Sequence, residues 1–440
     1  MSKDLSDKLY IYSPIVTERL VYVADFLSGA LALEVDVTDN PSVFEKNDIF
    51  VINYSDRQLS KNEVLYIQPS GLLFETGVHT GPPEVRTVIW QEQKVTGLYP
   101  NASECGFDLF SAIFYCISRI EEYNEASHDQ WGRFIPQESL AYKKRFIKHP
   151  LVDEWLYILR MSLQKKGLKQ KSLKFNFLLT VDVDCFLAYK ARPMISRILS
   201  VVNGLKEGDA MIRVKQFFGM SADPYDVFDE LHQIVEKNFI NKPKLFLHLG
   251  GHHPPYDRSN NPEHPEIIKK IKKLQSMFDV GLHPSWKSSS DFHQLLKEKR
   301  ILDEILQEEV DEFRQHFLKF TLPQSVYRNI EAGLRKDYSM GYSTIQGFRA
   351  STTFPFKFYD FNNEKMTDYV FYPFCWMDTA YIYHSKMNFE EKIQETIGLI
   401  NAVKKTSGIF VVVFHNESLS KRKLFLENRR LLEEIIKLTN

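Results

Sequence analysis

The sequence predicts an α/β protein whose larger, C-terminal part contains a parallel sheet. After residue 174, short apolar segments typical of strands alternate with longer segments of helical periodicity. Such alternation indicates parallel strands joined by crossover helices. Several of these strands end in polar residues, as in β/α barrels, where the catalytic side chains follow the strands. The alternation alone is compatible with a barrel or with a doubly wound sheet.

The first part of the chain has a different organisation. The 440 residues suggest about two domains. Short strands are predicted at 8–12, 49–53, 64–68 and 87–90, and a helix at 18–33 begins after Thr17. These elements predict a small α/β domain over residues 1–100.

A helical connecting region is expected over residues 101–171. Apolar residues at helical spacing predict one helix at 107–123 and a second at 150–164. A basic, polar stretch at 165–174 has the composition of a linker.

The third region, residues 172–440, contains the alternating elements. Strands are predicted at 173–181, 244–249, 278–282, 313–320 and 409–414. The intervening helices are predicted at 225–237, 265–277, 291–309 and 389–405.

Composition excludes several classes of function. The 56 basic and 57 acidic residues give a net charge of -1, which argues against nucleic acid or an anionic membrane as the main partner. The four cysteines form no CxxC pair, so neither a disulfide framework nor a structural zinc site is expected. Without a recognisable secretory signal or an apolar run of membrane-spanning length, the sequence predicts a cytoplasmic protein.

Carboxylates, imidazoles and a guanidinium recur at the predicted strand ends. The residues are Asp182 and Asp184 in TVDVD, His283 in GLHPSW, Arg314 and His316 in RQHFL, and His415 in VVFHNES. Asp182 and Asp184 lie two apart, so on a strand they share one face, and two carboxylates on one face repel unless they share a cation or a proton. Taken singly, such an Asp is as often a helix cap, and such a His is more often a satisfied hydrogen-bonding residue. Their convergence on one rim favours a metal-dependent hydrolase.

These motifs resemble the motif series of the polysaccharide deacetylase superfamily with the NodB-homology fold, a carbohydrate esterase type. GFRAST, the segment FDLFSAIFYCISRIEEYNEA and DQWGRF resemble more narrowly a divergent bacterial branch with an N-terminal accessory domain. The resemblance covers roughly residues 100 to 420. It implies a distorted (β/α) barrel and hydrolysis of an acetyl group from an amino sugar or polysaccharide.

The resemblance also implies residue roles. Asp182 matches the general base, Arg314 the arginine that orients the base, and His415 the general acid. Asp184 and His283 match ligands of a divalent metal ion. A mixed His and Asp ligand set suits zinc best, although manganese, cobalt or nickel remain alternatives.

The sequence departs from the family pattern at two positions. Val183 separates two Asp residues that are normally adjacent, so the base and ligand roles of Asp182 and Asp184 could be exchanged. The second histidine of motif two is replaced by Lys287, whose ammonium group cannot bind a metal. His316 on the neighbouring strand is the candidate third ligand.

Further candidates are weighed against structural roles. His252 and His253 could line the cleft, Arg349 could clamp a substrate anion or form a structural ion pair, and Asp378 could orient His415. A last group could stack on sugar rings but is more often core: Trp286, Tyr342 and Trp376.

Two other functions remain open. One is a catalytically impaired carbohydrate-binding or scaffold protein on the same barrel, which the missing histidine favours. The other is a hydrolase of a non-sugar C–N bond, because fold does not determine substrate.

Overall fold

The N-terminal part forms a four-stranded sheet of parallel strands in the order β2-β1-β3-β4. The computed structural model describes residues 8–46, 49–59, 64–78, 81–123, 127–189, 211, 214–215, 222–238 and 240–440. The strands are β1 (Lys8–Tyr12), β2 (Glu34–Thr38), β3 (Phe50–Tyr54) and β4 (Leu65–Ile67). Helix α1 (Glu18–Leu31) begins where the Thr17 side chain accepts a hydrogen bond from the Leu20 amide, as predicted.

A hairpin and a group of helices follow this sheet. The hairpin consists of β5 (Val85–Trp90) and β6 (Gln93–Leu98). The helices are α2 (Leu109–Ile117), α3 (Leu140–Lys143) and α4 (Leu151–Lys165). The single helix predicted at 107–123 is wrong in its second half, because Arg119 has a left-handed φ of 54° that interrupts it.

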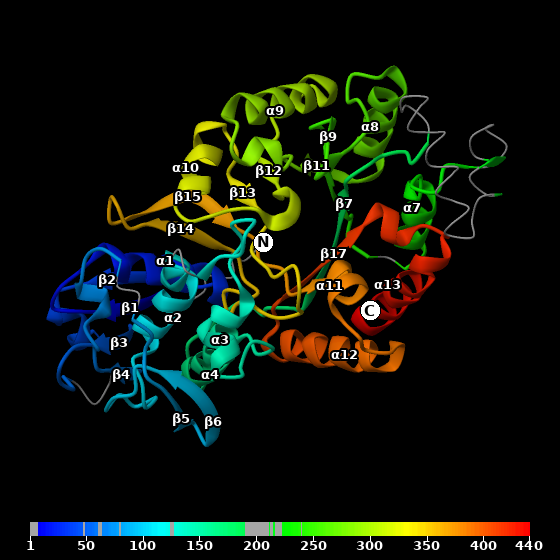
Figure 1. The fold of residues 1–440 in the computed structure, drawn as a ribbon. Coiled ribbons are helices and arrows are strands. Elements are labelled where there is room, and N and C mark those ends of the chain that lie inside the picture. The colour runs from blue at the N-terminus through cyan, green and yellow to red at the C-terminus, as the bar shows by residue number, and fades with distance from the viewer. Residues whose placement is uncertain are drawn as a thin grey trace, which may run out of the picture.

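The C-terminal part contains a curled nine-stranded sheet (Figure 1) in the order β14-β15-β13-β12-β11-β8-β7-β17-β16. All neighbouring strands are parallel except β14 and β15. The strands are β7 (Asn176–Val183), β8 (Lys244–Leu247), β11 (Asp279–Leu282), β12 (Glu312–Phe313), β13 (Lys336–Asp337), β14 (Phe356–Asp360), β15 (Lys365–Phe371), β16 (Trp376–Met377) and β17 (Ile409–His415). The predicted α/β class is confirmed, and the sheet is a half barrel that ends at β14 and β16.

Helices cover the half barrel on its outer side. In Figure 1, α8, α9 and α10 flank the strands β11 to β13, whereas α11, α12 and α13 lie near β17. The helices are α7 (Phe228–Lys237), α8 (Pro265–Met277), α9 (Phe292–Leu306), α10 (Gln324–Glu331), α11 (Asp378–His384), α12 (Phe389–Thr406) and α13 (Leu426–Thr439). A short antiparallel pair, β9 (His252–His253) and β10 (Asp257–Arg258), lies in the loop after β8.

One predicted strand is largely wrong. The segment 313–320 begins with the two-residue strand β12 and then turns into a 3-10 helix over His316–Leu318. Phe317 and Leu318 have left-handed φ values of 59° and 51°, which no strand can accommodate. Within this turn the His316 amide donates to the Pro284 carbonyl at 3.0 Å.

The N-terminal part and the half barrel share one continuous hydrophobic core. Helix α1 packs on β14 and β15, and the Tyr22 hydroxyl donates to the Lys357 carbonyl at 2.7 Å. Buried Arg349 binds buried Glu122 through Nε at 2.8 Å and Nη2 at 2.6 Å. Arg349 therefore forms the structural ion pair and is not available as a substrate clamp.

Glu122 is expected to stabilise the contact between the two parts strongly. Burial opposes its ionisation, but Arg349 and Arg119 lower the pKa of Glu122 to about 2. Glu122→Gln would leave the buried guanidinium of Arg349 without its ion-pair partner, whereas Arg119 would keep Glu121, and the loss should cost about 3–5 kcal/mol in the free energy of unfolding. Because the folded pKa is depressed, this stabilisation is present above the ordinary pKa and is lost as pH falls toward 2.

Denaturant unfolding of the Glu122→Gln protein measures this cost. Glu138 provides the control, since its ion pair with Lys143 is solvent-exposed. Glu138→Gln should change the unfolding free energy by less than about 1 kcal/mol. Equal effects of the two substitutions would contradict the buried-pair explanation.

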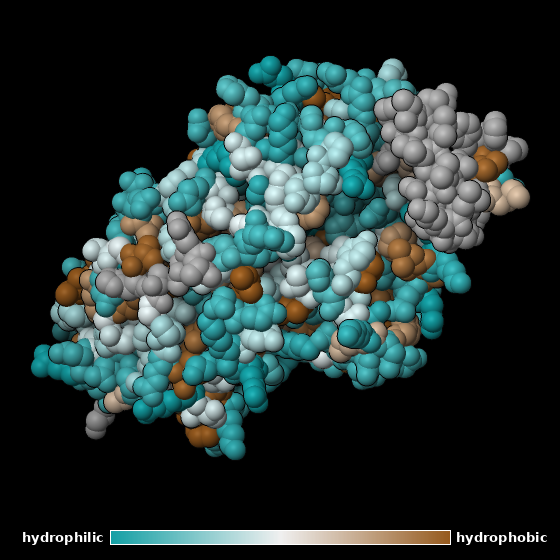
Figure 2. All heavy atoms as spheres, in the orientation of Figure 1, coloured by the Kyte–Doolittle hydropathy of each residue, from teal (hydrophilic) through white to brown (hydrophobic). Residues whose placement is uncertain are grey.

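The visible surface is mostly hydrophilic, and its hydrophobic residues are scattered (Figure 2). Among the described residues, no helix is long and apolar enough to cross a membrane.

Candidate functional site

The candidate site lies at the carboxyl ends of the parallel strands. Asp182 is in β7 opposite His415 of β17, and Asp184 follows β7. His283 follows β11, and Arg314 and His316 follow β12. The structure thus brings all six sequence-predicted site residues to one edge of the sheet.

A glycine allows these strands to approach closely. A Cβ atom on Gly281 would lie 2.7 Å from the Glu312 carbonyl oxygen and 2.8 Å from the Phe246 ring. The same Phe246 ring packs against the guanidinium of Arg314 at 4.6 Å. The glycine of GLHPSW therefore gives β12 and Arg314 their place beside β11.

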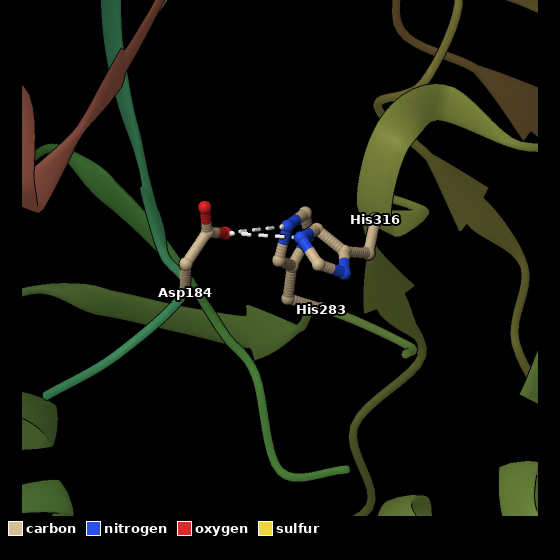
Figure 3. Close-up of side chains that lie close together, drawn as sticks. All are labelled: Asp184, His283 and His316. Atoms are coloured by element: carbon tan, nitrogen blue, oxygen red, sulfur yellow. Dashed lines mark ion pairs between the residues drawn. The ribbon is translucent and has the colours of Figure 1, made fainter. Parts of the chain in front are cut away.

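Asp184, His283 and His316 form a cluster of potential metal ligands (Figure 3). Asp184 Oδ1 lies 3.2 Å from His283 Nε2 and 3.7 Å from His316 Nε2. All three ligand atoms are within 4.8 Å of one another. Tetrahedral ligands at zinc distances of about 2.1 Å are separated by about 3.4 Å, so the three atoms could share one ion.

The second nitrogen of each imidazole is engaged by the protein. His283 Nδ1 lies 2.6 Å from the Arg314 carbonyl oxygen, and His316 Nδ1 lies 3.1 Å from Asp257 Oδ1. Both acceptors require a proton on Nδ1, which leaves the Nε2 lone pairs facing Asp184. Burial lowers the pKa of His316 to about 4, so its ring is neutral at physiological pH, as a metal ligand must be.

The cluster fits a divalent ion better than a set of hydrogen bonds. Within the described chain, buried Asp184 Oδ1 and His283 Nε2 make no hydrogen bond. A buried polar atom without a hydrogen-bond partner destabilises the folded protein unless a water molecule or an ion binds it. Burial opposes ionisation of Asp184, but His316, His283 and His415 hold its pKa well below the usual value, so it is an anionic oxygen ligand.

Asp182 is held beside this cluster by Arg314. Arg314 Nη1 donates to Asp182 Oδ1 at 2.7 Å, and Nη2 donates to the Thr180 hydroxyl at 2.9 Å. Arg314 Nε donates to the Tyr338 carbonyl, so each of the three guanidinium nitrogens is hydrogen-bonded to the protein. The carboxylate of Asp182 is buried and oriented, and its Oδ2 lies 4.0 Å from His415 Nε2.

His415 is paired with Asp378, the first residue of α11. His415 Nδ1 lies 2.7 Å from Asp378 Oδ1, and the His415 amide donates to Asp378 Oδ2 at 2.8 Å. Burial opposes protonation of the ring, but Asp378 outweighs it, and the pKa of His415 rises to about 10. His415 therefore carries a proton at neutral pH and can donate it.

Other candidates lie away from these contacts. Tyr342 and Trp376 are buried in the core. The Trp286 ring stacks on the Tyr256 ring, with their centroids 4.2 Å apart. The Lys319 ammonium nitrogen lies 3.8 Å from the centroid of the Trp286 ring. His252 and His253 are exposed in the β9–β10 pair.

Asp257 and His248 were missed by sequence reasoning. Asp257 is buried and accepts from His316 Nδ1, while His248 Nε2 lies 3.1 Å from Asp257 Oδ1. His248 directly follows β8, so the strand-end rule that selected His283 could have found it. Asp257 begins the two-residue strand β10 in the connection after β8, and no local sequence pattern indicates that it contacts His316.

The fold and site together define an α/β half barrel with a carboxylate and imidazole cluster at the carboxyl ends of its strands. Residues 9–168 match the profile of a family of unknown function, DUF7033. No curated protein matches the sequence.

Solved structures similar to the chain include deacetylase-type proteins. A candidate polysaccharide deacetylase of Mycobacterium smegmatis is 12% identical, with a TM-score of 0.39, over 60% of this chain and 85% of that one. A candidate polysaccharide deacetylase involved in O-antigen biosynthesis in Bordetella bronchiseptica is 16% identical, with a TM-score of 0.28, over 61% and 85%. A CE4 family pseudoenzyme of Bacillus anthracis is 13% identical, with a TM-score of 0.27, over 61% and 66%. Because these values are low, the function must be argued from the geometry of the site.

Proposed function

We propose that this protein is a metal-dependent hydrolase that removes an acetyl or other acyl group from an amino sugar or polysaccharide. The observation that carries the proposal is the convergence of Asp184 Oδ1, His283 Nε2 and His316 Nε2 within 4.8 Å, beside an Arg-bound Asp182. The motif resemblance supplies the sugar substrate class. Zinc suits this ligand set.

The side chains divide the chemistry between them. A bound divalent ion would polarise the acyl carbonyl and make the attacking water more acidic. Asp182, kept in place by Arg314, would take the proton of that water. His415, protonated through its pairing with Asp378, would give a proton to the departing sugar amine.

Arg314→Lys is expected to lower kcat by about 10²-fold or more, because an ammonium cannot bind Asp182, Thr180 and the Tyr338 carbonyl together. The measurement is kcat on the identified substrate, with zinc content determined in parallel. Retained zinc with reduced kcat is the expected pattern, since Arg314 contacts no ligand atom of Asp184. Full activity in Arg314→Lys would contradict a role in holding the base.

Two measurements test the proposal itself. The purified protein should contain one divalent ion per chain, and acetate release should be detected in a screen of N-acetylated amino sugars, nucleotide sugars and oligosaccharides. The matched control is His283→Ala, which should lose both the metal and the acetate release. A protein that binds no divalent ion would refute the proposal. Metal binding without release of acetate or another acyl product from any amide would favour the carbohydrate-binding alternative.

A further inference from the structure

We infer that Asp257 is a positioning residue that holds His316 as the third metal ligand. His316 thereby takes the place of the histidine that Lys287 replaces. The inference rests on the proposed metal site and adds to it a residue outside the motif series. With Asp257 in this role, the site keeps three ligands even though the turn that supplies His283 carries Lys287 where a second histidine is expected.

Asp257 is bound by four donors that come from three segments. Oδ1 lies 3.1 Å from His316 Nδ1 and 3.1 Å from His248 Nε2, and it accepts from the Trp286 amide at 2.7 Å. Oδ2 accepts from the Lys287 amide at 3.0 Å. Asp257 is 1% exposed, and no Lys or Arg side chain within the described residues forms an ion pair with it.

These bonds determine which nitrogen of His316 faces the cluster. A carboxylate accepts but does not donate, so the proton of the neutral His316 ring lies on Nδ1. The Nε2 lone pair is then directed toward Asp184. A carboxylate behind a ligand imidazole fixes the ring orientation and raises its basicity, and loss of such a partner typically weakens metal binding 10–100-fold.

Asp257 also joins the two ligand-bearing segments. The Trp286 and Lys287 amides belong to the turn that begins at His283, whereas His316 follows β12. One buried carboxylate therefore sets His316 relative to the turn that supplies His283. Only backbone atoms of Lys287 take part, so its side chain is free to differ from histidine.

His248 belongs to this network as a donor. The Gly250 amide donates to His248 Nδ1 at 3.3 Å, so the proton of the neutral ring lies on Nε2, which faces Asp257. A second ion among His248, Asp257 and His316 would have to displace these protons. The three side chains therefore act as a hydrogen-bonded support behind the cluster.

The first test compares zinc affinity in the full-length wild type, Asp257→Asn and Lys287→Ala, measured by competition with a chromogenic chelator. Asp257→Asn should bind zinc about 10–100-fold more weakly and should change the visible absorption spectrum of the cobalt-substituted protein. Lys287→Ala keeps the backbone amide and should bind zinc like the wild type. Circular dichroism and thermal unfolding of the apo-proteins separate loss of the ligand position from loss of the fold. Equal zinc affinity and an unchanged cobalt spectrum in folded Asp257→Asn would overturn the inference.

The second test needs no variant of Asp257. Long-range ¹H–¹⁵N NMR of the ¹⁵N-histidine-labelled wild-type protein loaded with zinc reports the tautomer of each ring, and the His316 signals are assigned by their loss in His316→Gln. We expect His316 to carry a slowly exchanging proton on Nδ1 and to bind zinc through Nε2. A proton on Nε2 would overturn the inference while leaving a site of Asp184 and His283 standing. If the wild type binds no divalent ion, the proposed function fails, and this inference fails with it.

Discussion

Asp184→Asn is expected to abolish stoichiometric zinc binding and to reduce activity to background, whereas Asp182→Asn should keep zinc and lose about 10²–10⁴-fold in kcat. The two carboxylates are two residues apart, yet their surroundings differ. Asp184 Oδ1 faces two imidazole nitrogens, and an amide there would replace the anionic ligand. Asp182 is bound by Arg314 and lies on the side of His415.

Metal analysis after dialysis and kcat on one substrate decide between these roles. Asp368→Asn is a suitable control, because Asp368 is 80% exposed on β15 and its substitution removes the same charge at a position that, in the described part of the chain, makes no hydrogen bond or ion pair with the cluster residues. It should leave both zinc content and kcat unchanged. If Asp182→Asn loses zinc while Asp184→Asn keeps it, the roles of base and ligand are exchanged.

The strand ends of the site were predictable from the sequence. Where a buried apolar strand stops and a polar residue follows, the topology alone brings the side chains together, as for Asp182, His283 and His415. The prediction needed no knowledge of loop conformation.

The conformation around His316 was not predictable. An apolar run at 313–320 favours a strand, but β12 ends at Phe313, and left-handed φ values at Phe317 and Leu318 belong to the tight turn that follows. Asp257, which is bound to His316, lies in the short strand β10, 59 residues earlier in the chain. Such contacts depend on how loops pack over the sheet, which neither periodicity nor local propensity encodes.

His415→Ala is expected to lower kcat by about 10²–10⁴-fold with little loss of substrate binding, because the substitution removes only the group that protonates the departing amine. The pH dependence should identify this donor. The pKa of His415 rises to about 10 against the effect of burial, chiefly through Asp378. An acid with a raised pKa keeps its proton at neutral pH and loses it at alkaline pH, so the alkaline limb of the kcat/KM profile should lie well above pH 7.

Asp378→Asn should shift that alkaline limb to lower pH, because the neutral amide no longer favours the imidazolium. The same linkage affects stability. A raised folded pKa stabilises the native state fully below the ordinary histidine pKa, and this contribution is lost as pH rises through about 10. Asp378→Asn should therefore be less stable than wild type near pH 6, and the difference should shrink above pH 10. The measurements are a pH–rate profile and thermal unfolding at several pH values, with Asp368→Asn as the charge-matched control. An alkaline limb that stays in place in both Asp378→Asn and His415→Ala would show that another group donates the proton to the leaving amine.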